Sequence, residues 1–244
     1  MLTGCGGGGV ENTTSPASGI YAGNTADGAV FNAVILLDNT MWAIYAQQLA
    51  DGSLRLLGAF TGAGKVTGST YTTADAKGIF YNPANPAATA LSSSTGAELA
   101  ASFVPGTSIS GTVRAPRVAS LGYSGAVPAA SQYVYLQPAQ LQSVVGRWDG
   151  AAINQEAAFL NVRADGSFTG AIGLCTYAGK FEADPRGINA FTSTLTLGAA
   201  PCAAPGLNLA GIAFSYKNTN GKTALVIAGL TADRATGTAF YAQR

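Results

Sequence analysis

The sequence predicts an all-β protein built from two similar antiparallel β-barrel or sandwich domains of about seven to eight strands each, with at most a short linking helix. Gly, Asn and Asp recur about every 8 to 12 residues, which is the spacing of turns between short strands. The segments between these turns are rich in alternating aromatic and β-branched residues, which favour strands. Several short patterns also return at a nearly constant offset, which indicates two related halves.

One hairpin shows the predicted local plan most clearly. Phe159 to Arg163 forms a strand, Asp165-Gly166 supplies a tight turn, and Ser167 begins the return strand. In the first half, Val30 to Leu37, Asp38-Asn39 and Met41 to Gln47 repeat the plan. Because Val30 to Leu37 is apolar on both faces, we expect it to be a central strand.

Three pairs of short, similar segments, called landmarks below, predict that the two halves arose by duplication. The first two pairs are 127 positions apart and the third is 126 apart: Gly19–Gly23 with Gly146–Gly150, Asp38–Thr40 with Asp165–Ser167, and Ser110–Val113 with Thr236–Ala239. The matches are short, so coincidence is the alternative explanation. If the duplication is real, each half has its own core and folds alone.

The regular spacing is lost between the halves, where Pro116, Pro128 and Pro138 fall. The predicted organisation is therefore a tether over residues 1–18, an N-terminal β-domain over 19–115, a linker over 116–143 and a C-terminal β-domain over 144–244. Within the linker, Gln132 to Leu136 predicts a short strand. Pro138, followed by apolar residues and then Gly146, predicts a short helix that covers a barrel end.

The start of the chain carries the clearest indication of location. Leu2-Thr3-Gly4-Cys5 resembles the lipobox of bacterial lipoproteins, which implies that Cys5 is the lipid-bearing N-terminus of the mature protein. The residues after it, from Gly6 to Ser18, have the composition of a flexible tether and would span about 20 Å as a random coil. The alternative is a chance match in a Gly-rich start, because only Met1 to Gly4 precede the cysteine and a signal peptide needs a longer apolar region.

Composition excludes several function classes. The net charge is +1 without Lys/Arg clusters, so the electrostatic footprint of a nucleic-acid-binding protein is missing. The longest apolar runs are far shorter than the ~20 residues of a spanning helix, so we expect attachment to a membrane through Cys5 alone. The chain contains no His, which excludes histidine-based triads and histidine metal sites.

Cys175 and Cys202 are predicted to form a disulfide. They lie 27 positions apart beside turn residues, and closing such a loop stabilises a fold by roughly 3 kcal/mol in the chain-entropy model. The bond needs an oxidising compartment, which agrees with export. Two buried free thiols are the alternative.

A family resemblance follows from the motifs of the second half. Gly146 to Gly150, Gly173-Leu174-Cys175-Thr176-Tyr177-Ala178-Gly179 and Pro201-Cys202 resemble the recurrent pattern of uncharacterised Gram-negative outer-membrane lipoproteins. More distantly, a tethered small barrel is similar in architecture to the barrels of transferrin-binding protein B. The resemblance implies a lipid-anchored protein of the outer membrane that faces the periplasm or the cell surface. It supplies no catalytic residues.

The sequence contains only weak candidates for catalytic residues. Asp149, Glu156, Glu182 and Asp184 are the carboxylates from which a glycosidase-like pair would come, but ordinary turns and landmarks explain their positions better. We therefore expect no enzyme activity, no cofactor and no metal site.

Two functions remain, and both are binding functions. The favoured one is a non-catalytic lipoprotein that binds a protein or glycan through loops or a sheet face, with Trp42, Tyr45 and Trp148 as the candidate binding surface. Trp42 and Tyr45 are three apart on one strand, so they face opposite sides unless a bulge intervenes. The alternative is a lipocalin-like carrier of a small apolar ligand, and the volume inside the barrels distinguishes the two.

Overall fold

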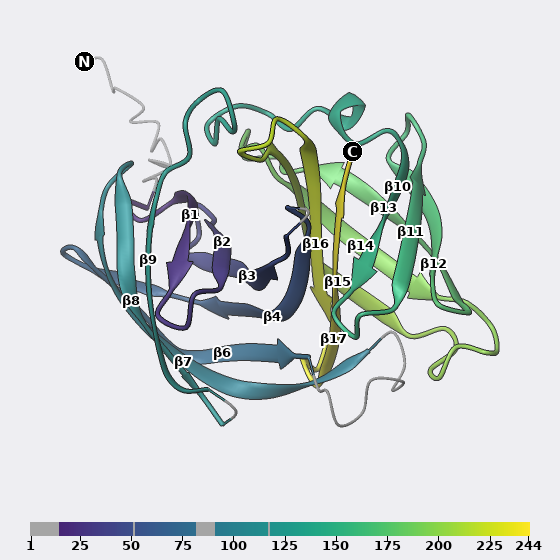
Figure 1. Ribbon diagram of the computed structural model, residues 1–244, viewed down its shortest axis with the longest axis horizontal. Coiled ribbons are helices and arrows are strands. Elements are labelled where there is room, and N and C mark those ends of the chain that lie inside the picture. The colour runs from purple at the N-terminus through teal and green to yellow at the C-terminus, as the bar shows by residue number, and fades with distance from the viewer. Residues whose placement is uncertain (1–14, 51, 82–90, 117) are drawn as a thin grey trace, which may run out of the picture.

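The chain folds into seventeen strands and one short 3₁₀ helix over the residues that the structure, a computed structural model, describes: 15–50, 52–81, 91–116 and 118–244 (Figure 1). The strands of the first half are β1 (Gly19–Thr25), β2 (Val30–Ile35), β3 (Thr40–Gln48), β4 (Leu54–Ala63), β5 (Lys65–Thr67), β6 (Thr70–Phe80), β7 (Ser92–Val104), β8 (Ser108–Ala115) and β9 (Val118–Ala126). The second half contains the 3₁₀ helix η1 (Leu141–Ser143), β10 (Gly146–Ala152), β11 (Ala157–Val162), β12 (Ser167–Ile172), β13 (Cys175–Ala183), β14 (Phe191–Leu197), β15 (Asn208–Lys217), β16 (Thr223–Leu230) and β17 (Thr236–Gln243).

Each half closes on itself as an antiparallel barrel. In the first half β1 pairs with both β2 and β9, and in the second half β10 pairs with both β11 and β17. The short β5 pairs with β6 beside β4, so eight strands complete each ring. The two barrels lie side by side in Figure 1, and a short pairing of β17 with β7 joins them. The prediction of an all-β fold with two barrels of about eight strands is confirmed.

The second hairpin of each barrel, β2–β3 in the first and β11–β12 in the second, has the same turn. Asn39 and Gly166 occupy the left-handed region, with φ of 66° and 81°. One side-chain oxygen of the preceding aspartate accepts a backbone hydrogen bond two residues on, from Thr40 at 2.8 Å and from Ser167 at 3.0 Å. The second pair of landmarks therefore marks equivalent places in the two barrels.

The third pair of landmarks does not. Ser110–Val113 lies on β8, the seventh strand of the first ring, whereas Thr236–Ala239 lies on β17, the eighth strand of the second. Both segments are Gly-containing strand segments, and turns of different length between the later strands bring them to a similar offset. That match was wrong.

Apolar side chains gather in three places. Two adjoining clusters line the interior of the first barrel, another fills the second, and one more lies between the barrels. On β2, Phe31, Ala33 and Ile35 face the first interior, while Val34 faces the cluster between the barrels. The strand predicted to be central is therefore buried on both faces.

The segment between the barrels differs from the prediction. Residues 118–126, assigned to the linker, form β9, which closes the first barrel. Residues 132–136 form no strand; their backbone instead makes isolated bonds, from Lys217 to the Gln132 carbonyl and from Asn189 to the Tyr135 carbonyl. Buried Tyr133 and exposed Val134 alternate as they would in a strand, but no described segment pairs with residues 132–136 in a β-ladder.

The predicted short helix is present as η1, three residues after Pro138. Leu141 at its start packs against the core of the second barrel, so the helix lies at a barrel end. The described parts of the chain contain no helix with the length and apolar character needed to cross a membrane.

Candidate functional site

An apolar cavity of about 40 Å³ lies inside the first barrel. Ten of its thirteen lining residues are apolar, among them Phe31, Ala33, Met41, Ala43, Phe60 and Leu99. The remaining three are Thr25, Tyr45 and Tyr123. The cavity exceeds the roughly 10–15 Å³ that one water molecule requires, and cavities with such walls tend to stay dry and to accept apolar guests.

Small side chains on neighbouring strands create this space. Ala33 on β2 and Ala43 on β3 are directly opposite each other in the register, and both line the cavity. Opposite residues on one face of an antiparallel pair have their Cβ atoms about 4.5–5.5 Å apart, so two methyl groups leave the volume that larger side chains would fill.

The interior of the second barrel is filled where the first is hollow. The second and third strands of that ring carry larger facing pairs, namely Ala158 with Ile172 on β11 and β12, and Val162 with Phe168. Aromatic rings then occupy the centre: the Phe168 and Phe181 centroids are 4.5 Å apart, and Phe191 follows at 6.0 Å from Phe181. The two barrels share an architecture but differ in how their interiors are packed.

The three polar side chains at the cavity have different surroundings. The Thr25 hydroxyl is within hydrogen-bond distance of the Asp27 carboxylate, at 2.5 Å, and of the Ala29 carbonyl, at 2.9 Å. Burial and the charge of Asp27 raise the pKa of Tyr45 to about 12. The Tyr123 hydroxyl is buried and has no hydrogen-bond partner among the residues that the structure describes. Burial also raises the pKa of Tyr123, so the hydroxyl keeps its proton.

The proposed binding surface of aromatic residues is not present as one surface. Trp148 is only 1% exposed, and its indole N–H donates to the Val144 carbonyl at 2.7 Å in the core of the second barrel. The guanidinium of Arg244 covers the Trp148 ring at 4.0 Å. The assignment of Trp148 to a surface was therefore wrong, because this ring fills a barrel interior.

Trp42 and Tyr45 face opposite sides of β3, as the strand period requires. Trp42 is half-buried against the cluster between the barrels. Tyr45 points into the first barrel, where it lines the cavity and lies 5.8 Å from Phe60 between ring centroids. One of the three candidate residues thus belongs to the cavity.

The candidate carboxylates are engaged with neighbouring side chains rather than with one another. Asp149 pairs with Arg147 at 2.7 Å and Glu182 with Lys180 at 2.8 Å, both on the surface. Asp184 is bound by Arg186, whose guanidinium also contacts Asp38 at 2.9 Å. Among the described residues there is no group of three His, Cys, Asp or Glu side chains that could hold a metal ion.

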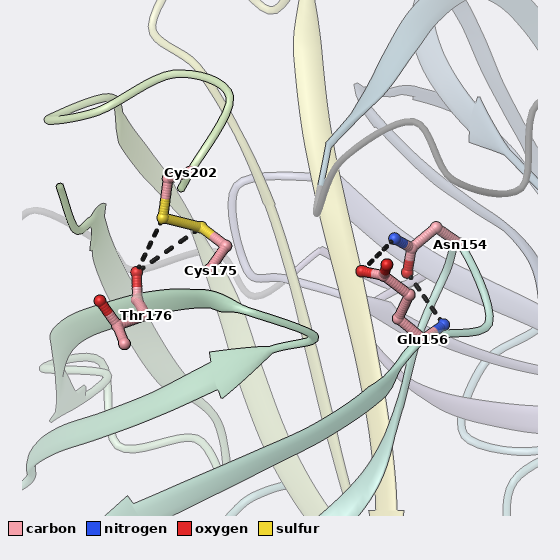
Figure 2. Close-up of a disulfide and its surroundings, with 5 residues drawn as sticks. All are labelled: Asn154, Glu156, Cys175, Thr176 and Cys202. Atoms are coloured by element: carbon pink, nitrogen blue, oxygen red, sulfur yellow. Dashed lines mark hydrogen bonds between the residues drawn. A yellow bond between two sulfur atoms is a disulfide. The ribbon is translucent and has the colours of Figure 1, made fainter. Parts of the chain in front are cut away.

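Glu156 accepts a hydrogen bond from the Asn154 side chain at 3.0 Å, in the turn between β10 and β11 (Figure 2). Figure 2 also shows the disulfide between Cys175 and Cys202, with the Thr176 carbonyl beside it. The bond ties the start of β13 to the loop before β15, as predicted. Cys5 lies outside the described residues.

No protein-family model matches the chain, and no curated protein matches it. Among solved structures, the chain is similar to a protein from Bacteroides fragilis provisionally assigned to the outer membrane, with 14% identity, 93% of this chain and 95% of that one covered, and a TM-score of 0.27. It is also similar to a protein of unknown function from the DUF3598 family of Nostoc punctiforme, with 9% identity, 94% and 96% covered, and a TM-score of 0.29. At these TM-scores neither likeness carries an argument about function.

Proposed function

We propose that this chain is a non-catalytic binding protein whose first barrel holds a small apolar molecule. The observation that carries the proposal is the apolar cavity between Ala33, Ala43 and the aromatic side chains, in a barrel whose partner is filled. The cavity has apolar walls and is small beside the roughly 300–1,000 Å³ of usual ligand pockets, so a guest larger than a few atoms requires the lining side chains to move outward. Of the two binding functions that the sequence leaves open, this geometry favours the carrier.

The binding of a protein or glycan through a sheet face is the less supported alternative. It depended on exposed Trp42, Tyr45 and Trp148, and these residues are distributed over the space between the barrels and the two interiors. No other feature of the described sheet faces indicates that a protein or a glycan binds there.

The absence of catalysis is part of the proposal. The chain has no His, and the carboxylates proposed as a catalytic pair are bound by Arg147, Lys180, Arg186 and Asn154. An acid and a base must be within reach of the same substrate atoms, and these pairs are separate.

We also propose that Cys5 carries lipid and anchors the protein to the outer membrane. The support is the Leu2-Thr3-Gly4-Cys5 pattern, followed by a Gly-rich segment with the composition of a tether. The disulfide between Cys175 and Cys202 adds to this support, because such bonds persist in exported proteins.

Thermal unfolding with and without toluene tests the ligand proposal. A ligand that binds the folded state at about ten times its Kd stabilises it by about 1.4 kcal/mol, which raises Tm by about 3–6 °C for a chain of this size. We expect this rise in the wild type. In Ala43→Leu the added side chain occupies the cavity, so we expect the toluene-dependent rise to disappear without a fall in the ligand-free Tm.

Ala158→Leu is the matched control, because Ala158 faces the filled interior of the second barrel. Overpacking there should lower stability by about 1–3 kcal/mol but leave the response to toluene intact. A wild type without a toluene response, or two variants that respond alike, would contradict the proposal.

A further inference from the structure

A polar groove of about 290 Å³ lies at the junction of the two barrels and differs in kind from the cavity inside the first one. Both barrels line it. Asn32 and Gln48 belong to β2 and β3, whereas Tyr216 lies near the end of β15 and Asn218 follows that strand. The groove therefore exists only because the two barrels are packed against each other.

Two further grooves adjoin this one. A groove of about 650 Å³ shares Leu54 and Tyr241 with it, and another of about 340 Å³ shares Tyr216 and Lys217. The three together, called the junction groove below, run along the boundary of the barrels. Pockets that hold small molecules have volumes of roughly 300–1,000 Å³, so the junction groove has room for a ligand of several linked units.

Amide side chains dominate the polar lining of the central groove, and charge is sparse. Five of its described lining residues are amides: Asn32, Gln48, Gln132, Asn218 and Asn220. Lys217 is the only charged residue among those described there and in the groove of about 340 Å³. The third groove has one residue of each sign, Arg55 and Asp149. An amide both donates and accepts hydrogen bonds, as a hydroxyl does, so this lining suits an uncharged ligand with many hydroxyl groups.

The floor of the central groove is held in place by its own hydrogen bonds. Asn32 is buried, and its side-chain nitrogen donates to the Tyr216 hydroxyl at 3.2 Å. The Asn32 side-chain oxygen accepts no hydrogen bond from another described residue, and it is not one of the polar atoms sealed from solvent, so a ligand can reach it. The Tyr241 hydroxyl lies 3.3 Å from the Gln243 side-chain oxygen, which also accepts from Asn218 at 3.1 Å. Groups fixed in this way lose little freedom when a ligand binds.

A saccharide fits this groove better than a peptide does. An extended peptide gains most of its affinity by adding a strand to an open sheet edge. β2, β3 and β16 each have a paired neighbour on both sides, so these strands at the junction offer no such edge. A saccharide needs no sheet edge, because its hydroxyls bond to side chains and its apolar ring faces pack on tyrosine rings.

We propose that the junction groove binds a neutral oligosaccharide, with Asn32, Gln48 and Gln132 among the residues that bond to its hydroxyls. The inference goes beyond the proposed function, because it concerns a different site and does not depend on a ligand in the first barrel.

Calorimetric titration of the full chain with neutral hexasaccharides tests this inference. The probes are cellohexaose, maltohexaose, xylohexaose, mannohexaose and N-acetylated chitohexaose, with hexagalacturonate and the peptide (Gly-Ser)₃ as comparators. We expect at least one neutral hexasaccharide to bind with a Kd of about 1 mM or tighter. Its disaccharide should bind about tenfold more weakly, because it occupies only part of the groove.

Gln48→Ala and Gln132→Ala should each raise that Kd by about 3- to 10-fold through the loss of hydrogen bonds. Gln47→Ala is the matched control: Gln47 is also exposed and precedes Gln48 on β3, but it points to the other side of the strand and does not line the groove. It should leave the Kd unchanged.

Four results would overturn the inference. They are no binding of any neutral hexasaccharide, equal or tighter binding of hexagalacturonate, binding of the peptide in place of the saccharides, and equal effects of Gln47→Ala and Gln48→Ala. The response to toluene in the first barrel is measured separately, so failure of one proposal is distinguishable from failure of the other.

Discussion

The aromatic residue of the repeated Gly-x-aromatic-x-Gly landmark is an internal anchor in both barrels. The Tyr21 hydroxyl donates to the Ala17 carbonyl at 3.0 Å, and the Trp148 N–H donates to the Val144 carbonyl at 2.7 Å, each four residues earlier. The last glycine of the landmark is required by close packing, because a Cβ would lie 2.0 Å from the Ser124 oxygen at Gly23 and from the Tyr241 oxygen at Gly150. The Gly-x-aromatic-x-Gly pattern thus has a structural role in each barrel: it supplies a buried aromatic anchor and a glycine that lets neighbouring strands approach closely.

Residue type alone does not show whether an aromatic side chain is a buried anchor or lies on the surface. Burial of Trp148 depends on Arg244, 96 positions away, and on a neighbouring strand set that composition does not specify. The cavity could not be predicted from the sequence for the same reason. Ala33 and Ala43 leave a space only because the pairing of β2 with β3 places them opposite each other, and the sequence does not specify that register.

At the scale of one residue, lipid attachment can be tested through Cys5. Expressed with an upstream lipoprotein signal sequence, the protein should partition into the detergent phase, and Cys5→Ser should move it to the aqueous phase because no acyl chain is attached. Phase separation followed by immunoblotting measures this. Equal partitioning of the two forms would refute the anchor.

Most strands were predictable, because period-two alternation and turn residues define them locally. The hairpin around Asp165-Gly166 was predicted correctly: most of Phe159 to Arg163 lies on β11, and Ser167 begins β12. The linker was not, because β9 contains Gly122 and Gly125 with few large side chains, whereas residues 132–136 alternate without a pairing partner. Pairing partners are a tertiary property that local pattern does not reveal.

The closing role of β9 gives a prediction about fragments. A fragment of residues 15–115 matches the sequence-based boundary but lacks β9, so β1 and β8 lose their partner and both edges are open. A fragment of residues 15–128 retains it. We expect cooperative thermal unfolding, followed by circular dichroism, for the longer fragment alone.

The complementary fragment 138–244 contains the disulfide and its own interior cluster. We expect it to fold with a Tm below that of the full chain, because the outer faces of β15, β16 and β17 lose their contacts with the first barrel. Adding fragment 15–128 should raise that Tm. A Tm equal to that of the intact chain would show that the cluster between the barrels contributes little.

On the scale of the molecule, two rings of eight strands share a buried interface and differ in their contents. Val34 and Ile44 of the first barrel belong to the same cluster as Phe214 and Val226 of the second. The filled second barrel and the shared cluster provide a rigid frame, so the first barrel can tolerate an interior that is not packed to full density. We propose that the two barrels divide their roles in this way, the second as frame and the first as container.

Xenon under pressure tests the claim most directly, since it binds apolar cavities without requiring a polar partner. A crystal of the protein exposed to xenon should show a bound atom inside the first barrel, near Met41, Ala43 and Leu99, and none among Phe168, Phe181 and Phe191 in the second. In crystals of Ala43→Leu the atom should be lost or much less occupied. A first barrel without xenon, or equal occupancy of both interiors, would contradict the account.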